Sequence, residues 1–109
     1  MRHTLVVCLF LLGCNSTFAQ KYADFYRSGK YAKALKSAEH AIESDSKNLD
    51  AYLTKAMCYI HLYRDPETHA DYPSGPSMAI NTWQVIQKKD KTGAFTQAHQ
   101  AQRDTILAE

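Results

Sequence analysis

Apolar residues between Lys30 and Ser44 recur at a spacing that places them on one face of an α-helix. The spacing follows the i, i+3, i+4, i+7 pattern of an amphipathic helix, and the positions are Tyr31, Ala34, Leu35, Ala38, Ala41 and Ile42. Because half of these residues are alanine, a second helix axis can approach this face closely. We therefore predict a helix over about 30–44 that is tightly paired with a neighbour.

Helical patterns continue on both sides of this segment. Residues 20–28 form a short helix that Gly29 ends, because glycine adopts the left-handed cap conformation without steric cost. After a polar turn, Asn48 is suited to cap a helix over about 49–63, and Asp50 suits the positive end of that helix. This helix has two apolar stripes, so we expect neighbours on two sides. The stripes are Tyr52, Ala56, Tyr59 and Tyr63, and Leu53, Met57 and Ile60.

Pro76 stands where a fourth helix is expected to begin, because proline is well tolerated in the first turn. This helix is predicted over about 76–89, with a face of Ala79, Ile80, Trp83 and Ile86. A fifth, weaker helix is predicted over 94–109, with Phe95, Ala98, Ile106 and Leu107 as its apolar residues. No stretch alternates β-branched with polar residues, which a strand would require. The predicted fold class is therefore all-α.

The segment 64–75 interrupts these helices. It begins "RDPETHADYPS", and its prolines exclude a regular helix. Acidic residues and a histidine alternate in it, at Asp65, Glu67, His69 and Asp71. Ligands from one loop need a supporting second shell to hold a metal, and their spacing matches no metal-binding motif. We expect a solvated loop and no metal site.

The order of small and large residues resembles the tetratricopeptide repeat, a helix–turn–helix unit of about 34 residues. The first repeat matches at Gly29, Tyr31, Ala34, Leu35, Ala38, Ala41 and Ile42, with Ser46 in place of the usual proline in its closing turn. The second matches at Tyr52, Ala56, Tyr59, Ala79, Ile80 and Trp83. Ala34 and Ala79 are 45 residues apart, about 11 more than one repeat, and the excess falls in the turn at 64–75.

The resemblance implies an α-solenoid of about two repeats plus one further helix, in a domain over 20–109. In that family the first helix of each pair lines a surface that binds a peptide or a partner protein. The corresponding residues here are Leu53, Met57, Ile60 and His61. The same stripe is also suited to packing against the first or fifth helix. Because the fifth helix has no sixth to pair with, it either closes the fold as a cap or leaves its far face open. The open face is favoured, and it implies a longer solenoid, self-association or a partner.

Charge excludes some partners. The chain has 109 residues, 13 basic and 11 acidic, with a formal net charge of +2. That charge is too small to indicate nucleic-acid binding, and no run of basic residues forms the face of a membrane-surface helix. Lys88, Lys89 and Lys91 are interpreted as the positive last turn of a helix.

The first 19 residues have the three-part form of a secretory signal peptide. A basic start precedes an apolar run from Thr4 to Leu12, in which Thr4 is the one polar residue. Two processing routes remain open. Small residues at Thr17 and Ala19 favour cleavage before Gln20, whereas "LLGC" resembles a lipobox that would make Cys14 the lipidated N-terminus after a signal over 1–13. A third route keeps the segment as an uncleaved anchor.

Candidates for catalysis are few. Cys58 lies in a helical pattern and is expected to be a packed, inert thiol, because no base and orienting group accompany it. No phosphate loop and no Cys or His metal motif occurs. We therefore expect no enzymatic activity, no cofactor and no metal.

The leading hypothesis is an exported scaffold of the bacterial envelope that binds another protein. The alternatives are a lipoprotein anchored at Cys14, and a domain that binds a small ligand or metal.

Overall fold

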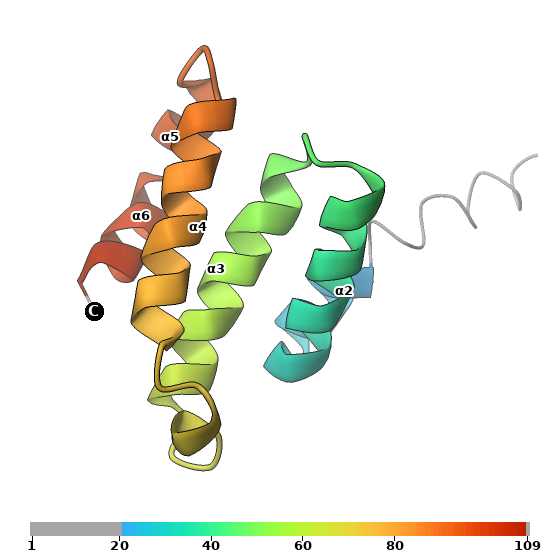
Figure 1. Ribbon diagram of the computed structural model, residues 1–109, viewed down its shortest axis with the longest axis vertical. Coiled ribbons are helices and arrows are strands. Elements are labelled where there is room, and N and C mark those ends of the chain that lie inside the picture. Colours follow the sequence, from blue (N-terminus) through green and yellow to red (C-terminus); the bar gives the residue numbers. More distant parts are fainter. Residues whose placement is uncertain (1–20, 109) are drawn as a thin grey trace, which may run out of the picture.

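The computed structural model describes residues 21–108, which are almost entirely helical (Figure 1). Residues 21–27 form a first helix. The elements that follow are α2 (Tyr31–Ser44), α3 (Leu49–Arg64), the 3₁₀ turn η1 (His69–Asp71), α4 (Gly75–Lys89), α5 (Ala94–Ala98) and α6 (Gln100–Leu107). No strand occurs within residues 21–108. The predicted all-α fold class is confirmed.

The helices α2, α3 and α4 run alternately up and down beside one another, with α3 in the middle (Figure 1). The helix at 21–27 lies behind α2, and α5 and α6 lie on the outer side of α4. The pairs α2–α3 and α3–α4 make the most extensive contacts, so each connection joins neighbours in space. This order of antiparallel hairpins is compatible with a helical repeat, and α3 has neighbours on two sides, as its two stripes predict.

Small residues set the spacing between the first three helices. Ala38 and Ala41 of α2 are buried against Ala51 of α3, and the ring of Tyr22 closes this cluster from the first helix. No side chain larger than a methyl group keeps these two helices apart at Ala38 and Ala51, which are fully buried. Asn48 caps α3 as expected, because its side chain accepts a hydrogen bond from the Ala51 amide at 3.1 Å.

The largest core lies between α3, α4 and α6. Its bulkiest member is Trp83, which is 2% exposed, and the remaining buried members are Leu53, Ala56, Ile60, Ala79, Ile86 and Ile106. Ile106 is supplied by α6, which therefore covers the seam between α3 and α4. Burial of apolar side chains of this size contributes about 1.5–3 kcal/mol each to folding, so α6 is an integral part of the domain.

The C-terminal segment differs from its prediction. Instead of one helix over 94–109, it forms α5 and α6, which are separated at His99. In a continuous helix the Phe95 carbonyl would accept the His99 amide. Here the His99 ring donates from Nδ1 to that carbonyl at 2.8 Å, and the His99 amide bonds to Thr96 instead. The side chain thus competes with the helix for its own backbone partner, and the chain bends.

The connection between α3 and α4 packs more closely than a solvated loop. The Thr68 hydroxyl donates to the Leu62 carbonyl at 2.6 Å, and the His69 ring bonds to the Tyr63 carbonyl at 2.6 Å. The Tyr72 ring lies edge-on to Tyr59 at 6.4 Å and packs against the core cluster that contains Leu62. The prediction of a solvated loop is therefore wrong for Thr68 and Tyr72, although the acidic residues of the loop are exposed.

Candidate functional site

The four residues predicted to line a binding surface do not lie together on the surface. Leu53 is 6% exposed and Ile60 is fully buried, and both belong to the core shared with α4 and α6. Met57 is partly buried against the same core. The prediction of a common binding surface fails for Leu53 and Ile60, because α4 and α6 cover the stripe that these residues form.

His61 is the predicted residue that remains partly exposed away from that core. Its ring stacks on the ring of Tyr31, with 4.1 Å between ring centroids and 2° between planes. The Tyr26 hydroxyl lies 3.0 Å from His61 Nε2, and the Tyr26 ring stands edge-on to both other rings. Tyr26, Tyr31 and His61, here called the aromatic cluster, come from three successive helices and are each partly exposed.

The turn at Gly29 brings the two tyrosines together. Gly29 has φ of 78°, a left-handed conformation that glycine adopts without a Cβ penalty. Around it, the Gly29 amide bonds to the Tyr26 carbonyl at 3.1 Å and the Lys30 amide bonds to the Phe25 carbonyl at 2.9 Å. These bonds close the first helix and reverse the chain directly into α2. Tyr26 and Tyr31 therefore face each other across a turn held by backbone hydrogen bonds.

Burial keeps the two hydrogen-bonded groups of the aromatic cluster uncharged. Desolvation lowers the pKa of His61 below its usual 6.5, and the positive charge of Arg64 lowers it further. Burial raises the pKa of Tyr26. At neutral pH the imidazole is therefore uncharged and the Tyr26 hydroxyl keeps its proton, so a neutral hydrogen bond joins this hydroxyl to Nε2. The cluster is thus a neutral, hydrogen-bonded aromatic surface.

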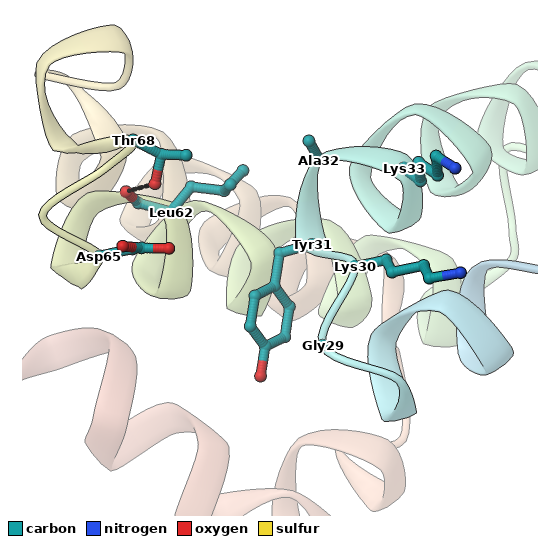
Figure 2. A pocket seen from close by; sticks show the side chains of 8 residues that line it. All are labelled: Gly29, Lys30, Tyr31, Ala32, Lys33, Leu62, Asp65 and Thr68. Carbon is teal, nitrogen blue, oxygen red and sulfur yellow. Dashed lines mark hydrogen bonds between the residues drawn. The ribbon is translucent and has the colours of Figure 1, made fainter.

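An open hollow of about 360 Å³ adjoins the aromatic cluster (Figure 2). The end of α3 and the loop after it bound one side, and the first residues of α2 bound the other. Its lining residues are Gly29, Lys30, Tyr31, Ala32, Lys33, Leu62, Asp65 and Thr68. Tyr31 is shared by the hollow and the cluster, so a ligand in the hollow would touch an aromatic ring. Asp65 places a carboxylate on the side opposite Lys30.

The described residues offer little for catalysis. Cys58 is fully buried, and burial raises the pKa of its thiol from 9.0 to about 12. It is therefore protonated at neutral pH, whereas the thiolate is the reactive form. Within residues 21–108, no three or more His, Cys, Asp or Glu side chains gather in a way that could hold a metal ion.

The predicted signal segment 1–19 and the lipidation candidate Cys14 lie outside the described residues. Over 21–108, no helix is both long enough and apolar enough to cross a bilayer. Comparisons with models of protein families, with curated proteins and with solved structures find no match to this chain.

Tyr26 and Tyr31 are site residues that sequence reasoning missed. Tyr31 was assigned to the apolar face of its helix, because its type and spacing are typical of core positions, and Tyr26 was given no role. One feature of the sequence predicts that Tyr26 and Tyr31 meet: they lie on either side of Gly29, at a tight turn. Their contact with His61 is not visible from local spacing, because His61 lies 35 residues after Tyr26.

Proposed function

We propose that this domain is a non-catalytic scaffold that binds a segment of another protein through the aromatic cluster and the adjoining hollow. The proposal rests on the rings of Tyr26, Tyr31 and His61, which are partly exposed and hold one another in position. Tyrosines of this kind are enriched in protein interfaces, where they offer a large apolar area and a polar tip.

Preorganisation supports this assignment. A side chain that is already held in one position loses little conformational freedom on binding. The stack of Tyr31 on His61 and the hydrogen bond between Tyr26 and His61 hold all three rings before a partner arrives. The hollow beside them offers an apolar wall at Leu62 and a carboxylate at Asp65. A partner segment with one apolar side chain and one basic or hydrogen-bonding group would complement these features.

Export to the bacterial envelope remains part of the proposal, with the resemblance to tetratricopeptide repeats and the form of residues 1–19 as its support. The mass of the mature N-terminus separates the routes. Cleavage before Gln20 gives an unmodified or cyclised glutamine, whereas the lipoprotein route gives an acylated Cys14. An intact Met1 terminus would show that the segment is retained.

Photo-crosslinking tests the proposal directly. A photoreactive phenylalanine analogue replaces Tyr31 in the full chain, and a matched variant carries it at Lys36, an exposed residue of the same helix. We expect a discrete protein adduct from position 31 that is absent from position 36. If both positions give the same adducts, or if neither gives one, the aromatic cluster is not a protein-binding site.

A small-ligand role is the second candidate. The volume of the hollow, about 360 Å³, lies at the lower end of the range that is usual for ligand pockets, roughly 300–1,000 Å³. A small molecule bound there would shield Tyr31 without any protein adduct. Mass spectrometry of the natively purified chain, which preserves bound small molecules, distinguishes this outcome from protein binding.

A further inference from the structure

Four lysines from separate parts of the sequence meet at one end of the molecule. Lys47 lies in the turn between α2 and α3, Lys88 and Lys89 end α4, and Lys91 follows in the next turn. Both turns lie at the upper end of Figure 1. Together with Leu49, these lysines line an open hollow of about 450 Å³. We call this surface the lysine end.

The positive charge of the lysine end is not neutralised by ion pairs. Among the ion pairs of the described residues, none includes these four lysines. Three carboxylates lie in or beside these turns, and the hydrogen bonds they accept come from other groups: Asp45 accepts from the Lys47 amide, Asp50 from the Tyr22 hydroxyl and Asp90 from the Thr96 amide. Lys89 lies 5.7 Å from the Tyr52 ring centroid, a contact that leaves its charge intact. The four ammonium groups therefore remain open to an anion.

The described chain also begins at the lysine end. The Tyr22 hydroxyl donates to Asp50 at 3.0 Å and accepts from Asn48 at 3.4 Å, which fixes the start of the first helix beside the α2–α3 turn. The sequence before it contains the apolar run from Thr4 to Leu12 and the lipidation candidate Cys14. A membrane anchor in that segment would keep the start of the first helix, and with it the lysine end, within reach of the lipid headgroups.

The far end of the domain carries both signs of charge, because Lys30 and Lys33 line a hollow there together with Asp65. Its loop carries Asp65, Glu67 and Asp71, all exposed, and lies at the lower end of Figure 1. An anionic surface would attract the lysine end and repel this loop. The lysine end, unlike this loop, presents a cluster of basic side chains, although the formal net charge of the chain is only +2.

We propose that the lysine end is a membrane-contact surface that binds the phosphate headgroups of anionic phospholipids. All four lysines are exposed on long side chains, which suits a surface of many charges better than one enclosed ion. Basic residues near an anionic bilayer strengthen binding by roughly fivefold each. This inference does not depend on the protein-binding role of the aromatic cluster, which lies near the other end of α3.

Vesicle partitioning of the full chain tests the proposal. Binding to phosphatidylglycerol-containing vesicles is compared with binding to pure phosphatidylcholine vesicles, at low and high salt. The test variant is K47Q/K88Q/K91Q, and the matched control is K30Q/K33Q/K36Q, which removes the same charge from exposed lysines of α2 and the turn before it. Circular dichroism of both variants must match that of the parent chain. Neutral vesicles report any binding that the apolar N-terminal segment provides alone.

We expect the parent chain to prefer anionic vesicles in a salt-sensitive manner. The test variant should bind them roughly ten- to a hundredfold more weakly, and the control should change by less than about threefold. Equal losses in the two variants would overturn the proposal, because net charge alone would then explain binding. Equal binding to both vesicle types would also overturn it. Displacement by millimolar inorganic phosphate beyond the effect of ionic strength would instead assign a soluble phosphate site.

Discussion

His61 shows how one side chain couples the candidate site to stability. Its folded-state pKa lies below the usual 6.5 because of burial and the nearby Arg64. The unfolded chain therefore takes up a proton at His61 at a higher pH than the folded chain does. The stability that the neutral ring contributes is fully present above about pH 6.5. It is lost as the pH falls through the folded-state pKa.

Urea unfolding at about pH 7.5 and about pH 5.5 measures the direction in which stability changes with pH. The unfolding midpoint of the parent chain should decrease on acidification by more than that of His61→Gln, because glutamine does not titrate. Comparing the two chains removes the contribution of the other histidines. If both midpoints decrease equally, His61 has the same proton affinity in the folded and unfolded states, and the neutral hydrogen bond with Tyr26 is not correctly described.

At the scale of elements, the contact between α3 and α4 depends on Gly75. An added Cβ there would lie 2.8 Å from the Tyr59 carbonyl oxygen and 2.8 Å from the Tyr63 Cβ, neither of which can rotate away. Overpacking of this kind costs about 1–3 kcal/mol, whereas alanine in a helix gains at most about 1 kcal/mol over glycine. Gly75→Ala should therefore lower the free energy of unfolding.

Asn81→Ala is the matched control for this contact, because Asn81 is exposed on the same helix. Its unfolding free energy should be unchanged or slightly raised, since alanine favours the helix. Denaturant titration of the two variants measures the difference. A Gly75→Ala variant as stable as Asn81→Ala would mean that α3 and α4 are farther apart than described.

Sequence patterns located the helices well where the determining signals are local. The apolar spacing of α2, the Asn48 cap and the proline in the first turn of α4 each act within a few residues, so these elements were predicted to within one residue at their ends. The break at His99 was missed, because it depends on a side chain competing for one carbonyl. The packing of Tyr72 was missed because its partners lie in α3.

At the scale of the whole molecule, the surfaces were less predictable than the elements. The stripe containing Leu53 and Ile60 was assigned from one helix alone, but the positions of α4 and α6 decide whether that stripe is exposed or buried. Lys88, Lys89 and Lys91 were interpreted as the end of one helix, whereas the fold adds Lys47 from another turn. Both outcomes depend on which helices pack together, and no local pattern contains that information.

The same holds for the aromatic cluster, which the fold assembles from three helices. Sequence reasoning found His61 but not the two tyrosines that contact it. We propose that these rings form the surface on which a partner protein binds. Tyr31 is the key residue of this surface, because its ring stacks on His61 and the residue also lines the hollow.

The most direct test is the affinity of the cross-linked partner for three purified chains: the parent, Tyr31→Ala and Lys36→Ala. Central aromatic residues of interfaces commonly contribute about 2 kcal/mol or more, so Tyr31→Ala should weaken binding by at least about tenfold. Lys36→Ala should bind within about twofold of the parent. Tyr31→Ala with unchanged helical circular dichroism and the affinity of the parent would show that the aromatic cluster is not the binding surface.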